Sequence, residues 1–253
     1  MNVRPALAVL QPGDPFPSAA DAWPAGSPAP GLLASGGALD VPTLRAAYQA
    51  TIFPWFGRGE PILWWSPDPR MVLPVAHFRL HRTLRRRLQR FAISPGCEIR
   101  FDHAFGAVID ACARAPRQGQ SGTWIGPQMR AAYRELHAAG NAHSVETWID
   151  GRLVAGLYCV AIGRAVFGES MFTTVADGSK IALAALVAWG REHGVSLIDC
   201  QQNTAHLASF GAVEMARAEF ADQVRALARE PAPPWQFEPV YWNHLIFPGF
   251  ARR

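Results

Sequence analysis

The sequence predicts a mixed α/β (α+β) fold, because apolar runs of strand length alternate with segments of helical spacing. The clearest case lies in the second half of the chain. Apolar runs at 153–162 and 165–172 are separated by Gly163-Arg164, which predicts a β-hairpin. Helical spacing follows over about 179–194, and 195–200 has the pattern of a short buried strand. Hairpin, helix and strand are therefore the expected centre of a mixed sheet.

The composition predicts a sizeable core and no membrane span. With 253 residues, of which 49% are hydrophobic, the chain could form one large domain or two smaller ones. No apolar run reaches the roughly 18 residues that a spanning helix needs, and the apolar patch at 6–10 is too short for a signal peptide. We expect a soluble cytoplasmic protein. The four cysteines lack the spacing of metal ligands, which favours buried thiols over a metal site.

The composition also changes along the chain. Residues 1–30 are rich in Pro, Ala, Gly and Ser and are expected to be irregular. Residues 31–75 are expected to form a small N-terminal domain, with paired glycines, a short helix at 42–50 and many aromatic residues. Residues 76–253 form the expected larger domain.

Further elements of the larger domain follow from hydrophobic periodicity and from glycines that end helices. A half-buried strand is expected at 143–149, where apolar and polar residues alternate, and Asp150-Gly151 then turns the chain into the central hairpin. The other predicted elements are helices at 79–90, 105–115, 127–139, 203–212 and 220–229 and a strand at 99–101.

A basic segment precedes the central hairpin. Seven arginines and no acidic residue lie between Pro69 and Cys97. A solvated helix face is one interpretation of such a segment, and contact with a phosphate backbone is the other. The arginines are Arg70, Arg79, Arg82, Arg85, Arg86, Arg87 and Arg90.

Three polar residues stand in otherwise apolar elements of the centre. Glu169 follows Gly168 in the second hairpin strand, while Asp199 and Gln201 end the last strand. A buried carboxylate is costly unless it has a partner or a task. These residues therefore predict a site.

Several short motifs occur in order along the chain. They are IFPWF (52–56), ILWWSPDPR (62–70), TWI (123–125), AHSVE (142–146), GESMF (168–172), SK-I-AL (179–183), and IDCQ (198–201) followed by HL (206–207) and GA (211–212). Taken together, these motifs resemble the leucyl/phenylalanyl-tRNA–protein transferases over about residues 31–220. The sequence departs from the family pattern at 38–40, Gly178 and Phe210, and none of these departures touches a polar site residue.

The resemblance implies both a fold and an activity. The fold is a small N-terminal domain followed by a domain like that of the GCN5-related N-acetyltransferases. The activity is transfer of leucine or phenylalanine from leucyl-tRNA or phenylalanyl-tRNA to the α-amino group of a protein that begins with arginine or lysine, which marks that protein for degradation under the N-end rule. An aminoacyl ester is already activated, so we expect no cofactor and no metal. We also expect no membrane partner, and a monomer.

The resemblance further implies catalytic roles for Asp199, Gln201 and Glu169. In a strand, residues 199 and 201 face the same side. We expect Gln201 to orient the attacking amine by hydrogen bonding and Asp199 to act electrostatically or as a base. The alternative role for Asp199 is to cap the helix expected in the following segment.

In the family, an apolar pocket for the leucine or phenylalanine side chain borders Glu169. The wall residues expected here are Leu157, Phe167, Met171 and Ile198. Strict alternation would put Phe167, Glu169 and Met171 on one strand face. Each apolar residue could equally belong to the core.

The resemblance also implies contacts with tRNA. Trp55 and Trp124 match tryptophans associated with the terminal adenosine, where stacking tolerates any base. Lys180 lies in the first turn of a helix, where a cation is unfavourable without an anionic neighbour. That neighbour is either Asp177 or an anionic group of a substrate. The residues expected to contact tRNA phosphates are Arg79, Arg82, Arg85, Arg86, Arg87, Arg90 and Lys180.

Two other functions would account for part of the sequence. A small-molecule N-acetyltransferase of the same fold would carry a glycine-rich loop for coenzyme A, but residues 173–180 contain one glycine. A non-catalytic RNA-binding protein would account for the arginines and tryptophans, yet it gives the buried carboxylates no task.

Overall fold

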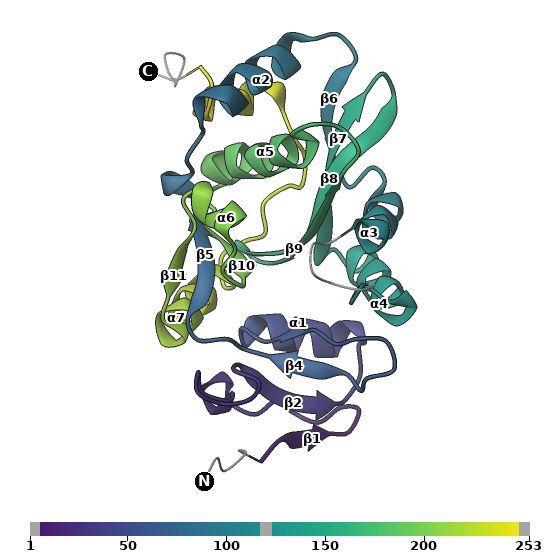
Figure 1. Cartoon of the computed structure of the whole chain (residues 1–253), viewed down its shortest axis with the longest axis vertical. Helices are drawn as coiled ribbons and strands as arrows, with labels where there is room; N and C mark the ends of the chain where they lie inside the picture. Colours follow the sequence, from purple (N-terminus) through teal and green to yellow (C-terminus); the bar gives the residue numbers. More distant parts are fainter. Residues whose placement is uncertain (1–5, 117–122, 248–253) are drawn as a thin grey trace.

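The computed structural model describes residues 6–116 and 123–247. These residues form two β-sheets with α-helices between and around them (Figure 1). The smaller sheet has four strands and the larger has seven. The mixed α/β fold that the sequence predicts is therefore confirmed. Within the described residues, no helix has the length and apolar character that crossing a membrane requires.

The small sheet is built from the N-terminal quarter of the chain. Its strand order is β1-β2-β4-β3, and helix α1 lies between this sheet and the rest of the molecule (Figure 1). Asp40 begins α1 because its side chain accepts the backbone N–H of Thr43 at 2.8 Å. The elements are β1 (Ala8–Leu10), the single turn η1 (Ala19–Asp21), β2 (Leu32–Gly36), α1 (Val41–Gln49), β3 (Phe53–Pro54) and β4 (Leu63–Trp65). Residues 6–30 are thus irregular apart from β1 and η1.

The large sheet has the order β11-β5-β10-β9-β8-β7-β6. Only the pair β9 and β10 is parallel, and every other neighbouring pair is antiparallel. The expected hairpin is the pair β8 and β9, which turns at Gly163 with φ 58°. The strands are β5 (Arg70–Pro74), β6 (Cys97–Phe101), β7 (Ala142–Ile149), β8 (Arg152–Ile162), β9 (Ala165–Thr173), β10 (Leu197–Gln201) and β11 (Val213–Met215).

Helices cover both faces of the large sheet and divide the core into two apolar clusters. Helix α5 contacts β7, β8 and β9 from one side, and α2 and η3 pack against α5. Helices α1 and α3 contact β8 from the opposite side, where α4 contacts β7. The helices are α2 (Arg82–Ile93), α3 (Phe105–Arg114), α4 (Pro127–Ala138), α5 (Gly178–His193), α6 (Ala205–Ser209), α7 (Arg217–Leu227) and the 3-10 turns η2 (Val75–His77) and η3 (Pro239–His244).

Strand β5 corrects the expected domain division at residue 75. The sequence assigned this strand to the N-terminal domain, but β5 pairs with β10 and β11 in the large sheet. Met71 and Leu73 pack in the cluster that contains α5, whereas Val72 packs in the opposite cluster. The apolar run is therefore a strand buried on both faces, which needs neighbours on both sides.

The segment after β10 also differs from the sequence prediction. Helix α6 has five residues and is followed by β11, where a longer helix was expected. Gly211, with φ 95°, ends this turn against the end of η2, and a Cβ there would lie 2.4 Å from the carbonyl oxygen of His77. Nearby, the backbone N–H of Arg79 donates to Phe210 O, and α2 begins at Arg82 rather than at Arg79.

Candidate active site

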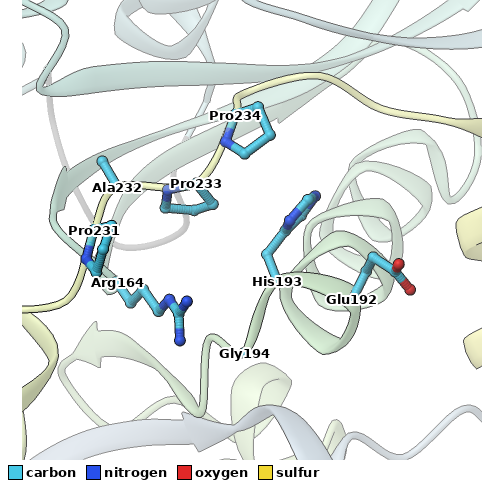
Figure 2. A pocket seen from close by; sticks show the side chains of 8 residues that line it. All are labelled: Arg164, Glu192, His193, Gly194, Pro231, Ala232, Pro233 and Pro234. Carbon is cyan, nitrogen blue, oxygen red and sulfur yellow. The ribbon is translucent and has the colours of Figure 1, made fainter.

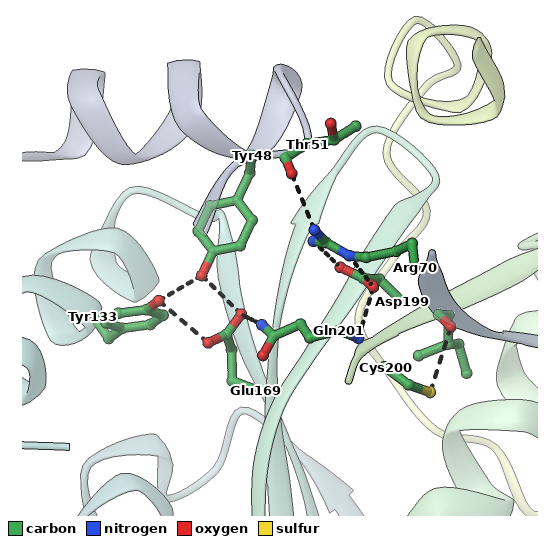
Figure 3. Close-up of polar contacts among 9 residues, drawn as sticks. Tyr48, Thr51, Arg70, Tyr133, Glu169, Asp199, Cys200 and Gln201 are labelled. Atoms are coloured by element: carbon green, nitrogen blue, oxygen red, sulfur yellow. Dashed lines mark hydrogen bonds and ion pairs between the residues drawn. The ribbon is translucent and has the colours of Figure 1, made fainter. Parts of the chain in front are cut away.

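Glu169 lies at an irregularity in the centre of the large sheet. In the pairing of β8 with β9, Tyr158 is opposite Ser170 and Cys159 is opposite Gly168, so Glu169 is an extra residue in β9. Such a bulge re-aims a side chain. The Glu169 side chain points toward α1 and α4 (Figure 3).

Two tyrosines and one amide hold the Glu169 carboxylate. Tyr48 of α1 donates to Oε1 at 2.7 Å, and Tyr133 of α4 donates to Oε2 at 3.3 Å. Gln201 Nε2 also donates to Oε1, at 3.0 Å. The two tyrosine oxygens also lie within hydrogen-bonding distance of each other. The site is therefore assembled from α1, α4, β9 and β10, and the small N-terminal part supplies one of its members (Figure 3).

Asp199 is fully buried and paired with Arg70 of β5. Arg70 Nε donates to Oδ1 at 2.8 Å and Nη2 donates to Oδ2 at 2.6 Å. The side chains of Arg70 and Asp199 are 1% and 0% exposed. Arg70 also donates to the carbonyl oxygen of Thr51, and its guanidinium lies over the ring of Phe53 at 4.7 Å. The ion pair therefore joins β10 to the end of α1.

Asp199 also fixes the backbone of Gln201. Gln201 has φ 61°, a left-handed conformation that costs energy for a residue with a Cβ, and its N–H donates to Asp199 Oδ1 at 2.8 Å. The register of β10 shifts between residues 199 and 201. The cap of the following helix is Thr204 rather than Asp199. Asp199 thus acts on Gln201 as a positioning residue, because both of its oxygens are occupied by protein donors.

The environment changes the acid–base properties of the cluster. Burial raises the pKa of Glu169 from 4.5 to about 8, and the hydrogen bonds from Tyr48 and Tyr133 only partly oppose that rise. Burial, followed by the charge of Glu169, raises the pKa of both tyrosines well above 10.0. At neutral pH, Glu169 can therefore exchange a proton while both tyrosines remain donors.

The four residues expected to line the apolar pocket do not come together. Leu157, Met171 and Ile198 share the cluster that contains α5, and Leu157 lies opposite Met171 in the sheet. Phe167 packs in the other cluster, with its ring 5.1 Å from that of Tyr48. The expectation that Phe167 and Met171 share a strand face is wrong, because the extra residue at Glu169 reverses the alternation.

The two predicted tryptophans are half-buried on the same side of the large sheet. Trp55 follows β3, and its carbonyl oxygen accepts the indole N–H of Trp65 at 2.6 Å. Trp124 lies in the loop before α4, next to residues outside the described part of the chain. Both rings pack against the cluster that contains Tyr48, Tyr133 and Phe167. Each tryptophan therefore borders the side of the sheet toward which Glu169 points.

The predicted basic residues divide into three groups. Arg70 is buried in the ion pair with Asp199, so its inclusion in a solvated or phosphate-binding segment is wrong. Arg85 donates to the carbonyl oxygen of Leu245, and Arg87 pairs with Asp177 at 2.7 Å. The side chains of the third group are exposed, and within residues 6–116 and 123–247 none of them forms an ion pair; they are Arg79, Arg82, Arg86 and Arg90.

The anionic neighbour of Lys180 is Asp177, one of the two candidates that the sequence offered. Its Nζ lies 2.7 Å from Asp177 Oδ1, at the first turn of α5. Asp177 also pairs with Arg87, so one carboxylate joins two cations. Beside them is a pocket of about 150 Å³, lined by His81, Thr83, Leu84, Asp177, Lys180, His206, Ser209 and Phe210.

A second pocket, of about 470 Å³, lies at the opposite end of α5 (Figure 2). It contains none of the predicted site residues and is lined by Arg164, Glu192, His193, Gly194 and Pro231–Pro234. In the described part of the chain, no group of three or more His, Cys, Asp or Glu side chains could hold a metal ion.

Sequence reasoning missed three members of the site. Tyr48 and Tyr133 occupy apolar faces of helices, where a tyrosine has the pattern of ordinary core. Arg70 was grouped with the other arginines although it alone directly precedes a strand-length apolar run, at 71–75. That position was the available signal, because a buried arginine needs a carboxylate partner.

The large mixed sheet carries a buried carboxylate–amide cluster at its centre, a feature that an enzyme of the α/β class can use to bind a substrate. The leucyl/phenylalanyl-tRNA protein transferase family matches residues 72–225, and the N-terminal domain of that family matches residues 37–68. The chain belongs to this family of aminoacyltransferases.

Relatives of known name agree along nearly the whole chain. A leucyl/phenylalanyl-tRNA–protein transferase of Albidiferax ferrireducens is 58% identical over 244 residues, covering 96% of each chain. That of a Polaromonas species is 60% identical over 237 residues, covering 94% of this chain and 93% of the relative. Among solved structures, FemX is similar at a TM-score of 0.44 and 11% identity, covering 69% of this chain and 66% of FemX.

Proposed function

We propose that this protein transfers leucine or phenylalanine from the 3′ end of an aminoacyl-tRNA to the α-amino group of proteins that begin with arginine or lysine. The product is a new peptide bond, and it marks the protein for degradation under the N-end rule in the cytoplasm. The observation that carries the proposal is the cluster of Glu169, Gln201 and Asp199, which the fold brings together in a chain of this family.

The reaction mainly requires that the amine and the aminoacyl ester be held in the correct relative orientation. The ester between amino acid and ribose is activated, and an α-amino group has a pKa of about 7.7–8.0, so part of it is neutral at pH 7. Holding amine and ester in place can contribute several kcal/mol to lowering the barrier. Glu169 and Gln201 would contact the amine as catalytic residues, while Asp199 would act through the backbone of Gln201.

The donor amino acid would be selected by an apolar pocket. Leu157, Met171 and Ile198 remain its proposed wall; they share one cluster, which lies on the face of the sheet opposite the Glu169 carboxylate, so the donor side chain would lie across β9 from the amine. Methionine adapts to both leucine and phenylalanine, since its side chain is unbranched and polarizable. Such a pocket would reject β-branched isoleucine by about 1–3 kcal/mol. Phe167 is proposed instead to hold Tyr48 in place by packing against its ring.

The tRNA itself would be held at two places. Trp55 and Trp124 are proposed to stack on the terminal adenosine, with about 1–3 kcal/mol for each stacked base. The exposed arginines of α2 are proposed to contact acceptor-stem phosphates. Lys180, already paired with Asp177, would add to this contact only through the adjoining pocket.

The direct experiment incubates the purified protein with radiolabelled leucyl-tRNA and a peptide that begins with arginine. We expect label on the peptide, and none on a matched peptide that begins with alanine. Isoleucyl-tRNA should serve at least about tenfold less well than leucyl-tRNA. Binding of tRNA without transfer would instead indicate an RNA-binding protein, and transfer from acetyl-coenzyme A would indicate an acetyltransferase.

A further inference from the structure

We propose that Glu169, and not Asp199, accepts the proton that the attacking α-amino group loses, and that Tyr48 and Tyr133 hold the Glu169 carboxylate for this step. The inference rests on the proposed aminoacyl transfer and assigns the proton within it.

Asp199 is poorly placed to accept a proton. Both of its oxygens are occupied, by Nε and Nη2 of Arg70 and by the N–H of Gln201, and its side chain is 0% exposed. A proton on Asp199 would leave Arg70 charged and without its counter-ion in a buried site, which is costly.

Glu169 also accepts hydrogen bonds at both oxygens, but its donors, Tyr48, Tyr133 and Gln201, are uncharged, so a proton on Glu169 leaves no counter-ion unpaired. Glu169 is half-buried, and its carboxylate lies between α1, α4 and β10. Burial raises its pKa to about 8, which is close to that of an α-amino group. Proton transfer between two groups of similar pKa needs little driving force, and a base works best near the operating pH.

Several groups around the carboxylate set its proton affinity. Tyr48 and Tyr133 lower its pKa by donating hydrogen bonds, and so does the positive charge of Arg70. The negative charge of Asp199 raises it. The groups that face Glu169 are Tyr48 from α1, Tyr133 from α4, Arg70 from β5, Cys159 from β8 and Asp199 and Gln201 from β10.

The step balances without a further reactant. The nitrogen of the neutral amine forms a bond to the ester carbonyl carbon, and the bond from that carbon to the ribose oxygen breaks. Glu169 takes one N–H proton as the nitrogen becomes positive. That proton ends on the departing ribose oxygen, so the products are an amide and a free hydroxyl, and the Glu169 carboxylate is regenerated.

The test measures kcat/KM for the peptide between pH 5.5 and 9 in the wild type and in Glu169→Gln. In the wild type, amine and Glu169 must both lose a proton, so log kcat/KM should rise with a slope approaching two below about pH 7. Glu169→Gln can keep hydrogen bonds but cannot accept the proton. It should lower kcat/KM by about 10²–10⁴-fold and reduce the slope to one.

Two controls separate this role from a structural one. Glu98→Gln changes an exposed carboxylate on β6 and should leave rate and slope unchanged. Asp199→Asn should keep the slope of two in whatever fraction of the protein folds. A slope of two in Glu169→Gln, or a slope of one in Asp199→Asn, would overturn the assignment.

A second measurement needs no variant to be active. The side-chain carboxyl of Glu169 can be titrated by ¹³C NMR in the folded wild-type protein and assigned by its absence in Glu169→Gln. We expect a midpoint near 8, and a midpoint near the ordinary 4.5 would refute the inference. If the wild type transfers no leucine at all, the proposed function fails. If transfer occurs but Glu169→Gln matches the wild type, only the proton assignment fails.

Discussion

Arg70 and Asp199 form a fully buried ion pair that joins β5 to β10, its neighbour in the large sheet. Their two hydrogen bonds, at 2.8 and 2.6 Å, have the paired geometry that gives such contacts specificity. The same arginine reaches the carbonyl oxygen of Thr51 at 3.2 Å, just beyond α1. The pair therefore fixes the small N-terminal part relative to the strand that carries Gln201.

Removing one partner of this pair should destabilise the fold strongly. Asp199→Ala leaves the Arg70 charge buried and unpaired, and Arg70→Met leaves the Asp199 charge buried and unpaired. Each variant should lower the free energy of unfolding by about 3–5 kcal/mol. The double variant should be less destabilised than the sum of the singles, because neither charge remains. Urea unfolding of the four proteins measures this coupling.

The exposed pair Arg225 and Asp222 of α7 is the matched control. Their side chains are 62% and 73% exposed, and their loss should cost no more than about 1 kcal/mol. Equal costs for the two pairs would show that burial of Arg70 and Asp199 does not govern their contribution.

This ion pair also shows how far the sequence could predict the site. Glu169, Asp199 and Gln201 could be expected to lie close together because each belongs to an element of one short hairpin–helix–strand unit. The partner of Asp199 lies 129 residues earlier in the chain, and no local pattern records that pairing. The bulge at Glu169 was unpredictable for a related reason, because it depends on the register between β8 and β9.

Glu169 should make the protein less stable as the pH rises. Its pKa is about 8 in the folded chain and 4.5 ordinarily, so between these values the folded state binds more protons than the unfolded state. The stabilising contribution is complete below pH 4.5 and is lost as the pH passes 8. Since one unit of pKa corresponds to about 1.4 kcal/mol, we expect a loss of about 2–4 kcal/mol for this partly exposed group.

Glu169→Gln isolates that contribution, because the amide does not titrate. Urea unfolding at pH 5 and pH 8.5 should find the variant more stable than the wild type at the higher pH only. A constant difference between the two proteins across this range would mean that Glu169 keeps an ordinary pKa.

Tyr48→Phe should move the titration of Glu169 upward. The hydroxyl of Tyr48 donates to Glu169 Oε1 at 2.7 Å and so favours the ionised carboxylate. Without that donor, the midpoint in the pH dependence of kcat/KM should rise, and Tyr133→Phe should raise it less because its bond is longer, at 3.3 Å. Tyr241→Phe in η3, where the ring packs against His193, is the control and should leave the midpoint in place. A fall in the midpoint for Tyr48→Phe would contradict the described hydrogen bond.

Arg82, Arg86 and Arg90 should account for most of the salt dependence of tRNA binding. They are four residues apart on α2, which puts them on one helix face, and all three are exposed. Each phosphate contact contributes about 0.7–0.9 to the slope of log K against log salt. Replacing all three by glutamine should therefore reduce the slope by about 2–3, as measured by tRNA binding between 50 and 300 mM salt.

Neighbouring arginines provide the comparison for that experiment. Arg87 is held by Asp177 at 2.7 Å, so Arg87→Gln should change the slope by less than any one of the three exposed positions. Arg225→Gln should not change the slope, because Arg225 lies on α7, away from α2, and pairs there with Asp222. If the triple variant keeps the wild-type slope while Arg87→Gln lowers it, the phosphates lie along the Asp177 side of α2 and not along the exposed face. The arginine at 87 would then have to exchange its carboxylate partner for a phosphate when tRNA binds.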